Sequence, residues 1–268
     1  MIRTTVFAVL VLAVCFADPL VAGPLDDAKT AFGAGDYATA FALWQPLAEQ
    51  GNAEAQDNVG RLFLTGRGVP ENGPEAVRWL VKAADQGETR SQILLGLIYE
   101  ARWGVPEDEA EAARWFAKAA LHGDLLAQTH LAGAYYEGRG VPQDFAEAAK
   151  WYRKLAELGD TSSQSRLADM YRDGRGVGQN YTEAARLYAE AADDGDDAAQ
   201  YQLGLLYRDG RGVPQDNVQA HLWLSLAAAS PNSVRESGAV RDLLAAGMTQ
   251  DQIAEATRLL REWRVQKK

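Results

Sequence analysis

The three histidines are the first candidates for metal binding or proton transfer. His122 and His130 stand eight residues apart and could meet across a turn between two helices, whereas His221 lies far along the chain. A zinc site needs further ligands at a spacing such as His-x-x-x-His or paired cysteines. No two histidines have the His-x-x-x-His spacing, and the single cysteine, Cys15, excludes a cysteine pair. We therefore expect ordinary, partly exposed histidines and predict no metal site and no cofactor.

Four aspartates flank Gly195 and raise the question of a calcium site: Asp193, Asp194, Asp196 and Asp197. An EF-hand loop places acids at alternating positions, a glycine at the sixth position and a glutamate at the end. That order is absent here. Asp196 is also well placed to cap a helix, so we interpret the cluster as capping and solvated carboxylates.

Candidate nucleophiles and phosphate loops are equally scarce. No serine stands in a G-x-S-x-G or S-x-x-K motif. Turns of the form Gly-Arg-Gly lack the Lys-Ser/Thr pair of a phosphate loop, and left-handed backbone at helix ends explains their glycines. We find no catalytic residues and predict that the protein is not an enzyme. Four turn arginines form a ladder with two open interpretations, solvated side chains or an anion-binding ridge: Arg67, Arg139, Arg175 and Arg211.

A 36-residue repeat positions all of these residues, and five units follow one another without insertion or deletion. The columns include aromatic, glutamine and tryptophan positions: Phe63, Tyr99, Tyr135, Tyr171 and Tyr207; Gln56, Gln92, Gln128, Gln164 and Gln200; Trp79, Trp115, Trp151 and Trp223, with Leu187 in the fourth place. Self-similarity at one fixed spacing is the signature of a repeat protein.

Each unit is predicted to form two helices. In the third unit Asp124 can cap a first helix, which Gly138 ends. Asp144 and Glu147 form a capping-box pattern for the second helix, which Gly159 stops. The same pair recurs in the other units: Asn72/Glu75, Asp108/Glu111, Asn180/Glu183 and Asp216/Gln219. One helix pair buries only one face, so that stacked units must create the core.

The two ends differ from the repeats, as solenoid caps should. Residues 23–52 are predicted to form a degenerate N-terminal helical hairpin, residues 53–230 the five repeats, and residues 231–268 C-terminal capping helices. Thr249 and Gln252 make a further capping box. Ile253, Leu260 and Trp263 lie on one face of the final predicted helix.

Residues 1–22 have the features of a secretory signal peptide. Arg3 precedes an apolar run of eleven residues, too short to span a bilayer, and cleavage is possible after Ala17 or Ala22. We therefore predict a periplasmic or secreted protein, with no membrane span in the mature chain. The formal net charge is −10, and it becomes −11 when cleavage after Ala17 removes Arg3. So acidic a chain is a poor partner for nucleic acid.

The columns resemble the Sel1-like repeat, a relative of the tetratricopeptide repeat. The fifth unit shows the pattern in full: Leu203, Gly204, Tyr207, Gly210, Gly212, Val213, Asp216, Ala220, Trp223, Ala227 and Ala228. The departures are local, with Arg102 for the first turn glycine of the second unit and Gly178 for the turn proline of the fourth. The resemblance implies an all-α fold, a right-handed α-solenoid of about five helical hairpins with capping helices at both ends.

The resemblance also implies a function. Its members generally act as scaffolds or adaptors, and several exported bacterial members serve the cell envelope. We therefore expect binding of a partner protein or peptide in the envelope. Two alternatives stay open: a hydrolase acting on β-lactams or cell-wall material, and a structural part of a polysaccharide-export assembly. The members with a β-lactamase label carry cysteine pairs in each repeat, which this chain lacks. The sequence leaves the oligomeric state undetermined.

The expected binding groove is lined by the first helix of each unit, by analogy with tetratricopeptide proteins. Its exposed positions vary between units while the neighbouring columns hold. The candidate residues are Arg90, Ile93, Leu97, Glu100, Leu126, Thr129, Tyr136, Ser165, Asp169, Arg172, Tyr201, Leu205 and Arg208. Apolar and aromatic members of this set are the strongest candidates, because such side chains on a groove often mark interaction sites.

Overall fold

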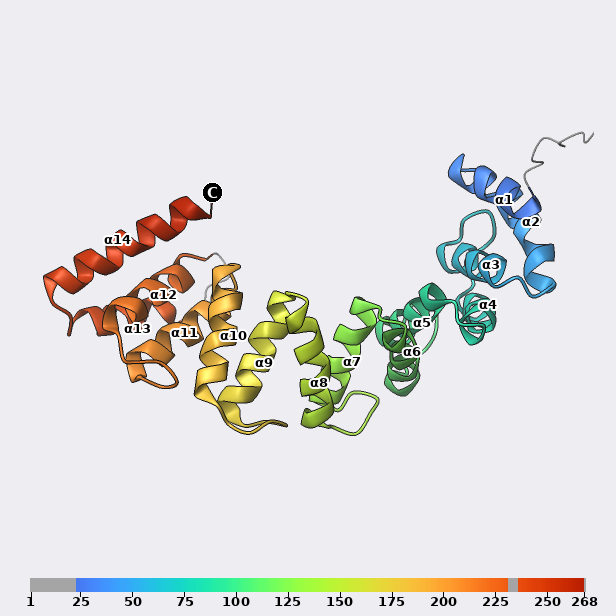
Figure 1. The fold of residues 1–268 in the computed structure, drawn as a ribbon. Helices are drawn as coiled ribbons and strands as arrows, with labels where there is room; N and C mark the ends of the chain where they lie inside the picture. The colour runs from blue at the N-terminus through green and yellow to red at the C-terminus, as the bar shows by residue number, and fades with distance from the viewer. Residues whose placement is uncertain (1–22, 231–235, 268) are drawn as a thin grey trace, which may run out of the picture. The chain divides into compact units, whose positions relative to one another are not determined.

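The structure, a computed structural model, describes residues 23–230 and 236–267, and within these ranges the chain contains helices and no strands. The helices (Figure 1) are α1 (Pro24–Gly33), α2 (Tyr37–Glu49), α3 (Ala53–Thr65), α4 (Gly73–Asp85), α5 (Thr89–Ala101), α6 (Glu109–Leu121), α7 (Leu125–Glu137), α8 (Phe145–Glu157), α9 (Thr161–Asp173), α10 (Tyr181–Asp193), α11 (Asp197–Asp209), α12 (Asn217–Ala229), α13 (Ser237–Ala245) and α14 (Gln250–Gln266). The predicted all-α fold is therefore confirmed. The predicted signal peptide lies outside the described residues.

The helices form two compact units, which divide within α4 between Trp79 and Leu80. In the first unit α2 packs against both α1 and α3. In the second unit each helix from α6 to α11 packs against the helix before it and the helix after it, while α13 and α14 both pack against α12 (Figure 1). Successive repeats of the second unit are thus stacked side by side.

Side-chain caps start the helices as the repeat predicts. The Asp124 carboxylate accepts a hydrogen bond from the Ala127 amide at 2.8 Å, and the Asp144 carboxylate accepts from the Glu147 amide at 3.0 Å. The second half of the predicted capping box at α8 is different, because the Glu147 side chain pairs with Lys150. Both halves form at α14, where Thr249 and Gln252 exchange bonds.

Glycines in the turns permit close approach between repeats. Gly138 ends α7 in the left-handed region, with φ 74°. Gly140, with φ 67°, lies on the start of α6 in the preceding repeat, and a Cβ there would stand 1.9 Å from the Glu109 carbonyl oxygen. Arg102 adopts φ 57° where other units have glycine, and this conformation costs roughly 1 kcal/mol for a residue with a Cβ.

The glutamine column ties each repeat to the one before it. Each side-chain amide nitrogen donates to a carbonyl oxygen eight residues earlier, near the end of the previous helix: Gln56 to Ala48 (3.0 Å), Gln92 to Ala84 (3.0 Å), Gln128 to Ala120 (3.2 Å), Gln164 to Ala156 (3.5 Å) and Gln200 to Ala192 (3.0 Å). Carbonyls in the last turn of a helix lack intrahelical partners. Each of these carbonyls also accepts from the amide of the glycine that follows the helix, so that the glutamine adds a second bond at every junction.

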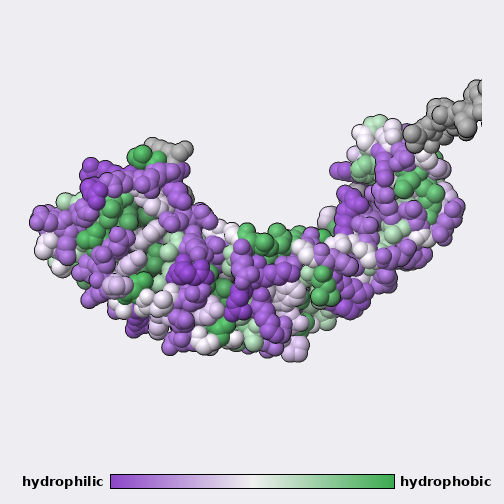
Figure 2. All heavy atoms as spheres, viewed as in Figure 1, coloured by the Kyte–Doolittle hydropathy of each residue, from purple (hydrophilic) through white to green (hydrophobic). Residues whose placement is uncertain are grey.

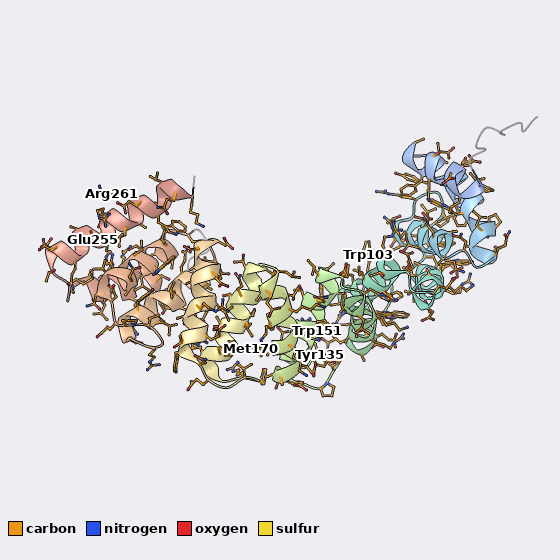
Figure 3. All side chains as sticks on the ribbon, in the orientation of Figure 1. Trp103, Tyr135, Trp151, Met170, Glu255 and Arg261 are labelled. Atoms are coloured by element: carbon orange, nitrogen blue, oxygen red, sulfur yellow. The ribbon has the colours of Figure 1, made fainter. Side chains whose placement is uncertain are left out.

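Small and large side chains alternate in the core of the second unit. Ala148 and Ala184 are fully buried and permit close packing of the helix backbones. Met170 is also fully buried, and Tyr135 and Trp151 pack half-buried against the same core (Figure 3). The aromatic and tryptophan columns are thus core positions, as their periodicity predicts.

The last helix closes the core of the fifth repeat. The Trp263 ring packs edge-on against Trp223, with ring centroids 6.5 Å apart, and its Nε1 donates to the Asp193 carboxylate at 3.2 Å. The outer face of α14 is polar, and Glu255 and Arg261 are exposed there (Figure 3). Among the described residues, no helix has the length and apolar character that a membrane span requires.

Candidate interaction surface

The predicted groove residues of the second repeat lie on α5. Arg90 is exposed, whereas Ile93 and Leu97 are half-buried and pack against the core cluster that contains Phe116. Most of the apolar area of Ile93 and Leu97 is therefore buried in the contact between α5 and its neighbours. Arg90 is exposed at the start of α5 and lies 3.8 Å from the Glu88 carboxylate.

Glu100, at the end of the same stripe, forms a polar cluster with the third repeat. Its carboxylate accepts from Arg139 Nη1 at 2.9 Å and lies 2.8 Å from His130 Nδ1. The His130 ring stacks on Phe116, with centroids 4.4 Å apart. Burial alone would lower the pKa of Arg139, but the bond to Glu100 and the charge of Glu137 raise it overall. His130 thus pairs with Glu100, while His122 is exposed.

The turn arginines act between repeats. Each of three guanidinium groups lies over the aromatic ring that opens the second helix of the preceding hairpin: Arg67 over Tyr37 at 5.2 Å, Arg175 over Phe145 at 6.0 Å and Arg211 over Tyr181 at 5.7 Å. Arg139 pairs with Glu100 instead. Arg67, Arg175 and Arg211 stay exposed while they make these contacts, so that both interpretations of the arginine ladder remain predictions.

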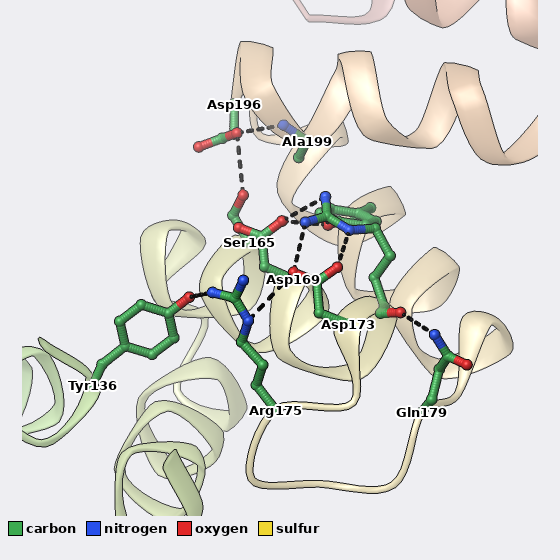
Figure 4. Close-up of polar contacts among 10 residues, drawn as sticks. Tyr136, Ser165, Asp169, Asp173, Arg175, Gln179, Asp196 and Ala199 are labelled. Atoms are coloured by element: carbon green, nitrogen blue, oxygen red, sulfur yellow. Dashed lines mark hydrogen bonds and ion pairs between the residues drawn. The ribbon is translucent and has the colours of Figure 1, made fainter. Parts of the chain in front are cut away.

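In the fourth repeat, the predicted groove residues form hydrogen bonds within the fold (Figure 4). The Tyr188 hydroxyl, which is fully buried, donates to the Asp169 carboxylate at 2.5 Å and accepts from Arg172 at 3.0 Å. Burial, followed by the Asp169 charge, raises the pKa of Tyr188. A hydrogen bond to Asp173 raises the pKa of Arg172 and lowers that of Asp173. Asp169 and Arg172 are therefore engaged within the fold.

Two further stripe residues take part in contacts between repeats. The Tyr136 hydroxyl accepts from Arg175 at 3.1 Å, and its ring packs edge-on against Phe145. The Ser165 hydroxyl donates to Asp196 at 3.4 Å (Figure 4). Tyr136 thus connects adjacent repeats, and Ser165 connects α9 to the residue that caps α11.

The stripe of the fifth repeat is half-buried. Tyr201 and Leu205 are only partly exposed, and Arg208 pairs with Asp209 at 2.7 Å. The hydrogen bond from Arg208 lowers the pKa of Asp209. Tyr201 and Leu205 are therefore exposed only along part of each side chain and do not form an open apolar surface.

The third repeat presents the most open apolar surface of the predicted stripe. Leu125 is 50% exposed and Leu126 is 47% exposed at the start of α7, and Leu158 is 63% exposed after α8. With Leu155 and Thr129 they line a pocket of about 430 Å³. We name Leu125, Leu126 and Leu158 the leucine surface. Figure 2 shows hydrophobic side chains gathered where α7, α8 and α9 meet.

Sequence reasoning found Leu126 and Thr129 but missed Leu125 and Leu158. A signal was available in the repeat itself. The positions of Leu125 and Leu158 are occupied in the other units by smaller or polar residues: Ala53, Thr89, Thr161 and Asp197; Gln86, His122, Asp194 and Ser230. A leucine at a position that four units leave small or polar is not explained by packing.

Within the described residues, no group of three or more histidine, cysteine, aspartate or glutamate side chains is arranged to hold a metal ion. The acidic cluster near Gly195 has a local role. The Asp196 carboxylate accepts from the Ala199 amide at 2.6 Å and caps α11.

The repeat pattern and the stacked hairpins have a counterpart among known proteins. The family model of the Sel1 repeat matches residues 33–52, 53–88, 89–124, 125–160, 161–196 and 197–232. The chain belongs to the Sel1 repeat family. Proteins of this family generally serve as scaffolds for protein–protein interaction. No curated protein matches this Sel1 repeat chain.

The solved structure of one Sel1 repeat protein agrees with the fold. A Sel1 repeat protein from Oxalobacter formigenes is 28% identical, with a TM-score of 0.69, over 90% of this chain and 98% of that one. A protective antigen of uropathogenic Escherichia coli is 24% identical, with a TM-score of 0.45, over 90% of this chain and 76% of that one. The first of these supports the solenoid of Sel1 hairpins.

Proposed function

We propose that this Sel1 repeat protein is an exported scaffold of the bacterial cell envelope. Residues 1–22 act as its signal peptide, so that the mature chain is periplasmic or secreted. It binds a partner protein or peptide along the first helices of its repeats, and the leucine surface is the anchor of that contact. The protein itself catalyses no reaction.

The exposure of the leucine surface carries this proposal. Burying a leucine side chain fully is worth roughly 1.5–3 kcal/mol. The three leucines are about half exposed, so that a partner covering them gains roughly 3 kcal/mol in total. A few such anchors supply most of the energy of an interface.

The other stripe residues fit the margin of this contact. Thr129 lines the leucine pocket, and Arg90 is a variable position on α5, the first helix of the neighbouring repeat. Polar, partly solvated side chains around an apolar centre are the usual arrangement of an interface rim. The partner's chain is expected to extend along this line from the leucine surface.

A pull-down from envelope extract tests the proposal. The bait is the chain without residues 1–22, beside a Leu126→Ser, Leu158→Ser variant. Leu243→Ser is the matched control, because Leu243 is 78% exposed but lies on α13. A partner lost only with the double variant supports the anchor. A partner kept by the double variant contradicts it.

Absence of catalysis is tested separately. We expect no turnover of nitrocefin or peptidoglycan by the pure protein. Turnover that a single serine or carboxylate substitution abolishes would overturn the scaffold proposal in favour of a hydrolase.

A further inference from the structure

The tryptophan column fills the junctions between repeats. Trp151, on α8, packs against the buried cluster that includes Ala120 and Leu131, and Tyr135 packs against the same cluster. Ala120 lies at the end of the preceding repeat, whereas Leu131 and Tyr135 lie on α7. The indole ring therefore occupies the space between the second and third repeats.

Leu187 takes the tryptophan position in the fourth repeat, and the junction beside it is open. A pocket of about 390 Å³ lies there, with an apolar wall formed by Ala156, Leu167, Tyr171 and Leu187. Each of these residues stands 36 positions after its counterpart at the preceding junction, namely Ala120, Leu131, Tyr135 and Trp151. The pocket thus occupies the place that an indole ring fills one repeat earlier.

Gln164 provides a polar group at this pocket. Its amide nitrogen lies 3.5 Å from the Ala156 carbonyl oxygen and 3.4 Å from a Glu190 carboxylate oxygen. Its amide oxygen has no hydrogen-bond partner in the described part of the chain, although the residue is only 6% exposed. The corresponding oxygens of Gln92 and Gln128 are also buried and unpartnered, so that this feature belongs to the repeat and not to the pocket.

The charge beside the pocket also departs from the repeat. Lys118 lies over the Trp115 ring at 4.2 Å, and Lys154 lies over the Trp151 ring at 5.5 Å. The equivalent residue in the fourth repeat is Glu190. The pocket is lined by three carboxylates against two guanidinium groups: Glu157, Glu183 and Glu190; Arg153 and Arg186. Arg186 pairs with both Glu183 and Glu190, so that the lining keeps one net negative charge, which favours a positive charge next to an incoming ring.

We propose that this pocket binds the indole ring of a tryptophan side chain, presented by a partner segment that carries a basic residue close to the tryptophan. The incoming ring takes the place of the missing column tryptophan, and the basic residue takes that of the column lysine. The site contains none of the leucine surface, so that it stands independently of the function proposed above.

Indole itself is the first probe. Calorimetric titration of the purified chain is expected to give one site with a dissociation constant on the order of 1 mM, as suits a ligand of this size. Leu187→Trp fills the pocket from within, and is expected to raise the Tm and to weaken indole binding at least tenfold. Equal binding by the wild type and this variant, or no binding by the wild type, would overturn the proposal.

Trp151→Leu provides a second and independent arm. This substitution recreates the same gap at the preceding junction, so that the number of bound indole molecules is expected to rise from one to two. If Leu187→Trp does not fold, this count decides. If folded Trp151→Leu still binds one indole molecule, the pocket does not correspond to the tryptophan position of the repeat.

Charged indoles test the basic residue. We expect tryptamine to bind about two- to fivefold tighter than indole, and indole-3-acetate to bind weaker by a similar factor, as for partly exposed charges. The difference should shrink at high salt. Equal affinities for the three compounds would remove the basic residue from the proposal.

Discussion

α7 in the third repeat and α9 in the fourth occupy equivalent places, and each has thirteen residues between an aspartate cap and a left-handed glycine. Their surfaces nevertheless differ. The third repeat exposes Leu125 and Leu126 where the fourth has Thr161 and Ser162. In the fourth repeat, the polar side chain of Asp169 instead accepts a hydrogen bond from the buried hydroxyl of Tyr188. The same position thus carries exposed apolar side chains in the third repeat and internal polar contacts in the fourth.

The difference shows where specificity can reside in a repeat protein. The glutamines recur at all five junctions, and the caps and turn glycines at most of them, because they connect, begin and end the helices. Surface positions are free to change, and so are single core positions when a pocket can be tolerated. Leu187 and the leucine surface are two such departures, at neighbouring places in the second unit.

The largest expected loss of stability comes from a substitution at a turn glycine that both repeats share. Gly140→Ala places a Cβ 1.9 Å from the Glu109 carbonyl oxygen and also strains a left-handed residue. We expect a loss of more than about 3 kcal/mol in the free energy of unfolding, measured by urea denaturation. Gly123→Ala is the matched control, because it is left-handed with no atom near its Cβ. It should lose only about 1 kcal/mol; equal losses would show that close approach is not what Gly140 provides.

The next effect separates core leucines from the leucine surface. Leu155 is buried, and Leu155→Ala is expected to cost about 2–4 kcal/mol. Leu158 lies three residues later and is largely exposed, so that Leu158→Ser should change the stability by less than about 0.5 kcal/mol. Thermal or urea unfolding of the two variants checks this. A large loss in Leu158→Ser would assign that side chain to packing.

One repeat position is expected to respond in opposite directions in the two repeats. Asp169→Ala leaves the buried Tyr188 hydroxyl without its acceptor, and should cost about 2 kcal/mol. The equivalent residue in the third repeat is Gly133, where a Cβ meets only the end of the Arg139 side chain. Gly133→Ala should therefore stabilise the protein by about 0.5–1 kcal/mol, through helix propensity. Effects of the same sign would contradict the contrast between the two faces.

The smallest effect depends on pH. The bond from Arg172 lowers the pKa of Asp173. A lowered carboxylate pKa gives stability that is present above the unfolded value of about 4 and is lost as pH falls through the folded value. The pair is partly exposed, so that Asp173→Asn should cost less than about 1 kcal/mol at pH 7. Unfolding of both proteins at pH 7 and pH 2 should show the difference disappear; a constant difference would exclude the ion pair as its cause.

Much of the fold was predictable because the residues that begin and end the helices recur at the same spacing in every repeat or nearly so. Asp124, Gly138 and Asp144 each have counterparts at the same spacing, so that helix starts and ends follow from local chemistry. The half-formed capping box at Glu147 was not predictable, because Lys150 competes for the same carboxylate. Arg102 could be recognised as a departure, and its left-handed backbone follows from the turn it replaces.

The candidate site was predictable only in part, because exposure depends on how neighbouring repeats meet. Periodicity places Ile93 and Asp169 on the same stripe as Leu126. It does not reveal that Ile93 packs against its own core, or that Asp169 reaches the buried Tyr188 hydroxyl. The substitution at Leu187 is visible in the sequence, but the open pocket beside it depends on the positions of Tyr171 and Gln164 across the junction.

Site-specific photocrosslinking tests the central claim most directly. A photoreactive phenylalanine analogue is placed at Leu126 in the third repeat, or at the equivalent Ser162 in the fourth, and both chains are exposed to envelope extract. Both positions are exposed, so that accessibility does not distinguish them. We predict a defined adduct from position 126 and none from position 162. Equal adducts at both positions, or an adduct from position 162 alone, would contradict the leucine surface as the anchor of partner binding.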